Sequence, residues 1–366
     1  MRFDPSRPNN FDLLRFAAAT LVLVDHSDVL TGREGRPGPF GYETYGGFAV
    51  AVFFIISGFL VAASWERAPR LWAFMLKRAL RIVPAYAAVV TLAALVLGPL
   101  VTDLPLRAYF HTRATWAYFS NLTFVELYYS LPGVFAGNAY PLAVNGSIWT
   151  LPIEVTMYIA LAALGLIGAF SRTFVTVLVA LLAVVWFGWD AELAAAPPLH
   201  YDTLPAAYTV HLALWFFTGS ALWLWRQHID YRADVGVALL VLLWWTEWTR
   251  AGAFVAHVAI PYLVIWAATL PVGWANRFGR AGDFSYGMYL YAFPVQQAVV
   301  SVGGASWPQP VFIAASFMLC LAFAVASWHG IEYPALRLKP RRTAPVAPEA
   351  VAADLMDGKT AGSGGV

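Results

Sequence analysis

The first apolar segment of the sequence, residues 11–30, holds two ionisable residues whose spacing could serve chemistry. Arg15 and His26 lie eleven positions apart. In a helix of 3.6 residues per turn, eleven residues return to within roughly 20° of the same face, about 16 Å along the axis. Ionisable groups inside a membrane helix are costly and by default face a cavity where they act. A histidine there could take a proton from a hydroxyl group, as acyl transfer to an alcohol requires, or it could simply bond to a neighbouring helix.

A second candidate is the run Phe53–Phe59, which contains Ser57 and Gly58. A Ser-Gly pair lets a backbone or a slender ligand approach a helix closely. Ser57 could donate a hydrogen bond to a carbonyl or thioester, but no histidine stands at a fixed spacing that would make it a nucleophile. Packing of small residues between helices is an equally good interpretation.

A third candidate is the arginine pair Arg78 and Arg81, three residues apart on one helix face and followed by Pro84. Paired guanidinium groups suit phosphate groups. Positive charge at the cytoplasmic edge of a membrane protein is also ordinary, and on this motif alone it is the preferred interpretation.

The fourth candidate surrounds a carboxylate in an apolar segment, and it comprises Trp149, Glu154 and Tyr158. Glu154 and Tyr158 are four residues apart and share one helix face. The charge count of the loops places Glu154 near the outer side of the membrane. An intramembrane carboxylate is either functional or paired with a cation, for which Arg15 is a candidate. Asp12 is an alternative partner for Arg15.

Two further runs, Asp283–Tyr291 and His329–Pro334, place polar groups at helix ends predicted to be cytoplasmic. Structural roles are the favoured interpretation of both.

The composition indicates an integral membrane protein. The chain has 366 residues, of which 60% are hydrophobic and 12% are charged, whereas soluble domains have about a quarter charged residues. The net charge of +2 gives no case for nucleic-acid binding. The single cysteine, Cys320, excludes an intramolecular disulfide and a multi-cysteine metal site, and no metal site is expected.

The predicted fold is all-α, with about ten transmembrane helices of roughly 20 residues each. Counting Lys and Arg in the loops places both termini in the cytoplasm. Residues 102–147 resist this scheme, because one crossing by the apolar run within 114–130 would give every later loop the wrong sign. That segment is therefore expected to be re-entrant or interfacial. The predicted spans are 11–30, 47–63, 82–101, 148–170, 174–189, 204–225, 235–248, 253–270, 284–302 and 311–329.

The chain divides accordingly into three parts. Residues 1–10 are a cytoplasmic N-terminal segment, and residues 11–336 form the transmembrane domain. Residues 337–366 are rich in Ala, Pro and Gly and are expected to be a disordered cytoplasmic tail.

Taken together, these segments resemble the acyltransferase-3 family of membrane proteins from about Asn10 to Pro334. Each motif alone is weak, but six motifs in order, at sensible depths in a ten-helix protein, are specific. Thr150 replaces a usual serine and keeps the hydroxyl, and Ala292 stands where many members have a second histidine. The matching elements are Arg15 and His26 with ten residues between them, Phe53–Phe59, Arg78-x-x-Arg81 before Pro84, Trp149–Glu154, Ser285–Leu290 and Glu332–Pro334.

The resemblance implies transfer of an acyl group, commonly acetyl from acetyl-CoA, to a hydroxyl of a carbohydrate or related acceptor. Arg78 and Arg81 would hold the phosphates of CoA, and Ser57 with Gly58 would let the pantetheine arm pass. The donor would be a substrate, with no cofactor bound permanently.

The resemblance also assigns roles around the acceptor. His26 would be the general base on the hydroxyl, with Arg15 stabilising charge or positioning the donor. Glu154 would bind the acceptor or set the charge of His26, and Trp149 and Tyr158 would contribute to substrate binding.

Three functions compete at this point. The first is a multi-pass O-acyltransferase of the inner (plasma) membrane that modifies a surface glycan or its lipid-linked precursor. The second is the same chemistry on a small glycosylated metabolite. The third is a transporter or flippase for an anion or proton, which is disfavoured because the paired Gly/Pro-interrupted helices of inverted-repeat transporters are not evident. Membrane lipids surround the protein in all three cases, and the sequence leaves its oligomeric state open.

Overall fold

A computed structural model describes residues 2–41, 43–188, 206–247 and 249–339 of the chain. Within these residues every regular element is a helix, and extended pairing is limited to three isolated bridges. The predicted all-α class is therefore confirmed.

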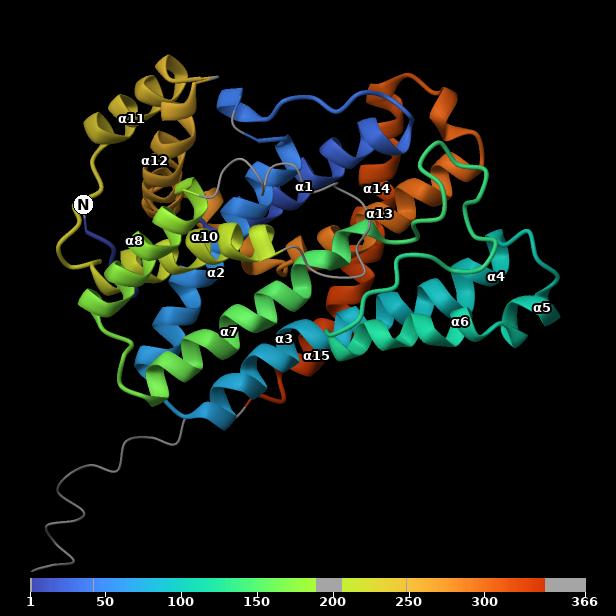
Figure 1. Cartoon of the computed structure of the whole chain (residues 1–366), viewed down its shortest axis with the longest axis horizontal. Coiled ribbons are helices and arrows are strands. Elements are labelled where there is room, and N and C mark those ends of the chain that lie inside the picture. Colours follow the sequence, from blue (N-terminus) through green and yellow to red (C-terminus); the bar gives the residue numbers. More distant parts are fainter. Residues whose placement is uncertain (1, 42, 189–205, 248, 340–366) are drawn as a thin grey trace, which may run out of the picture.

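The longer helices are joined mainly by short connections, and most of them coincide with the predicted apolar spans (Figure 1). They are α1 (Phe11–Leu30), α2 (Tyr45–Arg67), α3 (Leu71–Leu92), α7 (Thr150–Leu166), α8 (Arg172–Gly188), α10 (Ala206–Leu224), α11 (Ala233–Trp245), α12 (Arg250–Thr269), α13 (Ser285–Ser301) and α14 (Gln309–Ser327).

Among the described residues, five helical segments are long and apolar enough to cross a membrane: Tyr45–Arg67, Leu71–Val101, Gly146–Leu166, Ala251–Thr269 and Gln309–Leu336. Two more apolar helices, α8 and α11, are shorter, with 17 and 13 residues. The molecule is thus a helical protein with candidate membrane spans. The count of ten crossings and the cytoplasmic placement of both termini stay predictions.

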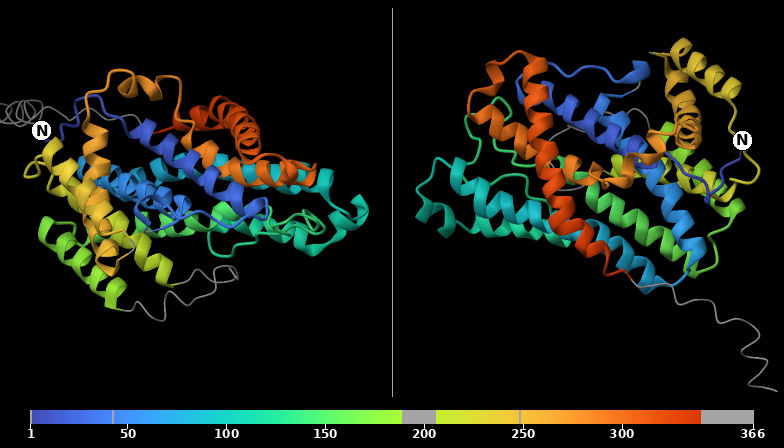
Figure 2. Two further views of the ribbon diagram at one scale, coloured as in Figure 1. Left: turned by 90° about the horizontal axis from the view of Figure 1, so that it is seen from above. Right: turned by 180° about the vertical axis from the view of Figure 1, so that it is seen from behind.

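The centre of the bundle is built on α1, which packs against both α2 and α13, with α10 against α2 and α14 against α13. The start of α2 lies beside the end of α1, where the hydroxyl of Thr44 donates a 3.3 Å hydrogen bond to Asp25. The two helices therefore run antiparallel. Helices α11 and α12 lie at one edge of the bundle, and α4 to α6 lie at the opposite edge (Figures 1 and 2).

Two glycines set the close approach of α2 and α10. A Cβ added at Gly58 would lie 1.8 Å from the carbonyl oxygen of Phe216, and one at Gly219 would lie 2.2 Å from that of Ile55. Both contacts are with backbone, which cannot turn aside as a side chain can. The small residues of α2 therefore permit helix packing here.

The segment 102–147 forms no long helix. After α4 (Gly98–Val101), the helices α5 (Leu106–His111) and α6 (Arg113–Ala117) are followed by a 3₁₀ turn, Tyr118–Thr123, that packs beside α3. The ring of Phe124 lies 5.1 Å from that of Tyr86, midway along α3. The chain then returns, since Thr102 bridges Val134. The segment therefore leaves one end of the long α3 helix, packs beside α3 and returns to the same end. Its placement relative to a membrane stays a prediction.

The C-terminal helix does not stop at α14. It continues through a π-helical turn, Trp328–Glu332, into α15 (Tyr333–Leu336). The predicted tail, 337–366, lies outside the described residues from 340 onward.

Candidate active site

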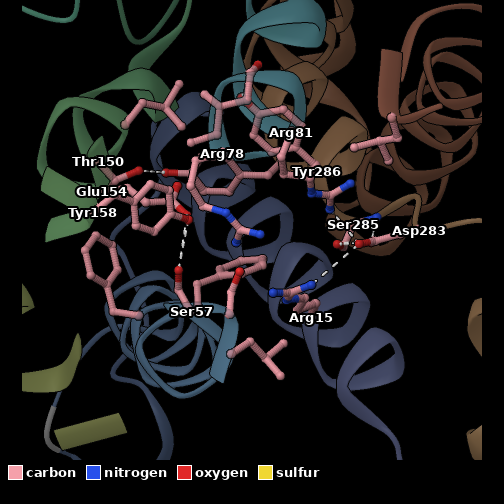
Figure 3. A pocket seen from close by; sticks show the side chains of 18 of the residues that line it. Arg15, Ser57, Arg78, Arg81, Thr150, Glu154, Tyr158, Asp283, Ser285 and Tyr286 are labelled. Atoms are coloured by element: carbon pink, nitrogen blue, oxygen red, sulfur yellow. Dashed lines mark hydrogen bonds and ion pairs between the residues drawn. The ribbon is translucent and has the colours of Figure 1, made fainter. Parts of the chain in front are cut away.

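A cavity of about 380 Å³ lies among α1, α2, α3, α7, α13 and the C-terminal helix (Figure 3). One wall is a single face of α2 on which lining residues recur every three or four positions, from Val50 to Arg67. This wall is about 25 Å long at 1.5 Å per residue. The polar residues that line the cavity are Arg15, Ser57, Ser64, Arg67, Arg78, Arg81, Thr150, Glu154, Tyr158, Asp283, Ser285, Tyr286, Tyr289 and Lys339.

On one side of the cavity, three polar side chains from two helices form a hydrogen-bonded group. The hydroxyl of Ser57 lies 3.0 Å from that of Tyr158 and 3.4 Å from Oε1 of Glu154. The hydroxyl of Tyr158 also donates to Oε1 of Glu154. The expected common face of Glu154 and Tyr158 is therefore present, and it meets Ser57 of α2.

Glu154 lines the same cavity as Arg78 and Arg81. The connection before α7 carries the chain into the bundle before the helix begins at Thr150, and there the hydroxyl of Tyr289 donates a 2.7 Å hydrogen bond to the carbonyl of Ser147. The placement of Glu154 near the outer side of the membrane stays a prediction.

On the other side of the cavity, Arg81 is held by two carboxylates. Its Nη2 lies 2.5 Å from Oδ2 of Asp283, and its Nη1 lies 3.6 Å from Oε2 of Glu332. The guanidinium also lies 5.6 Å from the ring centre of Tyr286. Arg81 is thus largely neutralised and fixed by the two C-terminal motifs, for which structural roles were the favoured interpretation.

Arg15 shares this carboxylate. Its Nη1 lies 3.6 Å from Oδ2 of Asp283, so Asp283 is the acid that pairs with Arg15. The sequence predicted Asp12 or Glu154 as the partner instead. Burial opposes ionisation of Asp283, but Arg81 and Arg15 together hold its pKa below the usual value. Asp283 is therefore an anion shared between two arginines.

Arg78 differs from both. It makes no ion pair with any residue in the described part of the chain, and its Nε is buried without a hydrogen-bond partner. Its guanidinium lies 5.8 Å from the ring centre of Tyr158. Figure 3 shows it pointing into the cavity between the Ser57 group and the Asp283 group. A buried guanidinium without an ion pair in this position favours an anionic ligand.

His26 does not line this cavity. Its ring packs edge-on against Phe293 of α13 at 5.2 Å, and its Nδ1 is buried without a hydrogen-bond partner among the described residues. Tyr289, one helical turn before Phe293, does line the cavity. His26 therefore packs against a residue one helical turn along α13 from the cavity lining. Arg15 lines the cavity itself, so the structure brings only the first of the two residues to it.

Two other predicted site residues face elsewhere. Gly58 packs against the backbone of α10, so the structure places it at a helix contact and not on the cavity wall. Trp149 lies beside the ring of Tyr208 at 5.5 Å and is not among the lining residues.

Sequence reasoning missed Lys339 as a site residue and gave Asp283 and Tyr289 no part in the chemistry. A lone carboxylate at a helix start carries no signal that it will meet an arginine some 200 positions away, at Arg81. Lys339 had been assigned to the tail. Thr150, noted as a departure from a usual serine, keeps its hydroxyl within 2.7 Å of that of Tyr289.

Comparison with known proteins identifies the family. Residues 9–329 match the family model of an acyltransferase domain, and this range covers nearly the whole chain. The chain belongs to the acyltransferase-3 family. It is therefore an acyltransferase, one that transfers groups other than aminoacyl groups, and its apolar helices make it a membrane protein.

Two curated relatives of this acyltransferase cover almost its full length. An O-acetyl transferase of Shigella phage Sf6 is 27% identical over 330 residues, spanning 89% of this chain and 95% of its own. Nodulation protein 10 of Rhizobium leguminosarum bv. viciae is 29% identical, spanning 90% of this chain and 94% of its own. No solved structure matches the chain.

Proposed function

We propose that this acyltransferase moves an acetyl group from acetyl-CoA to a hydroxyl of a surface glycan or its lipid-linked precursor in the inner membrane. The observation that carries this proposal is the cavity, which holds five cationic side chains against two carboxylates. The cations are Arg15, Arg67, Arg78, Arg81 and Lys339, and the carboxylates are those of Glu154 and Asp283. A polyanion with a slender neutral arm, such as acyl-CoA, matches this combination.

The hydrogen-bonding side chains beyond the cations suit the slender arm of the donor. Ser57, Tyr158 and Glu154 can bond to its amide groups, and the apolar wall of α2 around Phe53 and Phe54 can cover its carbons. The thioester would then point toward Tyr289 and, one turn further, toward His26.

His26 is the proposed general base. Its buried Nδ1 has no hydrogen-bond partner in the part of the chain that the structure describes, so an acceptor hydroxyl can supply one. In the proposed step, His26 takes the hydroxyl proton as the acceptor oxygen attacks the thioester carbonyl. The tetrahedral intermediate then collapses to the ester, and its C–S bond breaks. The leaving sulfur of CoA takes the proton back from His26 and departs as the thiol. Arg15, which forms an ion pair with Asp283, would position the donor in the cavity, away from the reacting atoms.

The name of the phage relative supports an oxygen acceptor. A glycosylated small metabolite offers the same hydroxyl chemistry, and an acceptor panel containing both classes separates the two possibilities.

The test uses purified protein in detergent with acetyl-labelled acetyl-CoA and the acceptor panel. We expect base-labile label in the acceptor with the wild type and a loss of at least about 100-fold for His26→Ala, because general-base catalysis contributes about that much. His228→Ala, in an exposed turn after α10, is the matched control and should keep full activity.

Transfer by His26→Ala at the wild-type rate would remove the histidine from the mechanism. Uptake of an anion into vesicles, without acetyl transfer, would instead favour a transporter.

A further inference from the structure

The α2 wall of the cavity changes character along its length. The lining residues at its first end, Val50, Phe53 and Phe54, are apolar, and the lining residue at its last end is the cation Arg67. Phe53 and Arg67 are fourteen positions apart, which is about 21 Å along a helix. The polyanionic part of an acyl-CoA therefore belongs toward Arg67, and its acyl group belongs at the apolar end.

Three side chains from three helices meet at the apolar end. The ring of Tyr289 on α13 packs edge-on against that of Phe53 on α2, with 5.7 Å between the ring centres. The hydroxyl of Tyr289 lies 2.7 Å from that of Thr150, the first residue of α7 (Figure 3), and donates a hydrogen bond to the carbonyl of Ser147. Tyr289 is thus fixed at its hydroxyl and packed along its ring, so it cannot turn aside to admit a larger ligand.

The space beyond Tyr289 is filled. Phe293, one helical turn later on the same face of α13, is buried. A Cβ added at Gly146 would lie 2.6 Å from the ring of Phe293, so the backbone of the connection before α7 lies directly against this ring. The same ring packs against that of His26. Phe293 and Gly146 are not among the residues that line the cavity, so in this direction the cavity ends at Tyr289.

We infer that Phe53, Thr150 and Tyr289 enclose the acyl group of the donor and restrict this acyltransferase to acetyl and similarly short groups. This inference rests on the proposed acyl-CoA donor. The hydroxyl of Thr150 is held by Tyr289, so its methyl group and the two rings are the surfaces left to face the acyl carbons. A closed apolar pocket discriminates by about tenfold or more for each extra methylene.

The experiment compares donors whose acyl groups differ only in length. The purified full chain receives acetyl-CoA, propanoyl-CoA or butanoyl-CoA with one hydroxyl acceptor, and isothermal titration without acceptor gives the dissociation constant of each donor. For the wild type, we expect kcat/KM to fall about tenfold with each added carbon, and the dissociation constants to rise in the same order. Phe53→Ala should raise the use of butanoyl-CoA relative to acetyl-CoA by at least about tenfold.

Thr150→Ser is the milder variant, because it removes one methyl group and keeps the hydroxyl that bonds to Tyr289. It should keep the Tm of the wild type and raise the use of propanoyl-CoA relative to acetyl-CoA about tenfold, the value of one carbon. Thr156→Ser is the matched control. It removes the same methyl group from an exposed residue of α7 that does not line the cavity, and it should leave the ratio of the donors unchanged.

Equal use of the three donors by the wild type, or an unchanged ratio in both Phe53→Ala and Thr150→Ser, would overturn the inference and leave the proposed function standing. Dissociation constants that rise with acyl length, without transfer to any hydroxyl, would uphold the acyl pocket and count against the proposed function instead. The two failures are therefore distinguishable.

Discussion

Replacement of Arg81 by alanine separates a structural arginine from a ligand-binding one. Arg81 lies 2.5 Å from Asp283 and 3.6 Å from Glu332, and the side chains of these acids are only 14% and 2% exposed. Removing one partner of a buried ion pair costs roughly 3–5 kcal/mol, because the remaining charge stays buried and unpaired. Asp283 keeps Arg15 at 3.6 Å and the hydroxyl of Ser285 at 2.5 Å. Most of the loss should therefore fall on Glu332.

We expect Arg81→Ala to lose about 2–4 kcal/mol of stability, below the full value because Arg81 is 20% exposed. Arg78→Ala leaves no ion-paired carboxylate of the described residues without its partner and should lose less than about 1 kcal/mol. Thermal unfolding in detergent at pH 7, followed by tryptophan fluorescence, should show a Tm several degrees lower for the first variant only. Glu332→Gln added to Arg81→Ala should recover part of this loss, because it removes the stranded charge.

The opposite pattern would refute this reasoning. If Arg81→Ala has the Tm of the wild type and weakens the binding of CoA as much as Arg78→Ala does, both arginines bind the ligand and the distinction drawn between them fails.

Two other predictions concern packing and pH. Gly58→Ala should lower the Tm markedly, because its Cβ would lie 1.8 Å from a backbone oxygen of α10. Gly188→Ala, whose Cβ would meet no atom of the described residues within 4 Å, should not. An unchanged Tm for Gly58→Ala would show that α2 and α10 are not packed as described. The affinity for CoA should be highest at pH 7 and fall as the pH rises through about 8, the value to which burial lowers the pKa of Lys339, because the ammonium loses its proton while the phosphates stay charged. Titrations from pH 7 to 9 test this, and an equal fall in Lys339→Ala would contradict it.

The sequence predicted the helices well and their mutual placement poorly. Hydrophobicity and length placed α1 at residues 11–30, as the structure has it, because these are properties of single segments. The common face of Glu154 and Tyr158 followed from helical spacing in the same way. Their contact with Ser57, about 100 positions earlier, depends on which helices are neighbours, and no local pattern encodes that.

Depth in the bundle was the other limit. Loop charges order the crossings, but they do not reveal that the connection before α7 enters the bundle, nor that Glu154 lines the same cavity as Arg78 and Arg81. Arg78 and Arg81 looked alike in sequence for a similar reason. What distinguishes them is the presence of Asp283 and Glu332 beside one of them, and both acids lie more than 200 positions away.

The central claim is that acetyl-CoA bound in the cationic cavity gives its acetyl group to a saccharide hydroxyl with His26 as the base. The most direct measurement is transfer of label from acetyl-CoA to a saccharide acceptor by purified wild-type protein and by His26→Ala. The account predicts base-labile label in the acceptor with the wild type and a loss of at least about 100-fold with the variant, whose Tm and CoA affinity stay unchanged. Absence of transfer by the wild type to any hydroxyl acceptor, or equal transfer by both proteins, would contradict it.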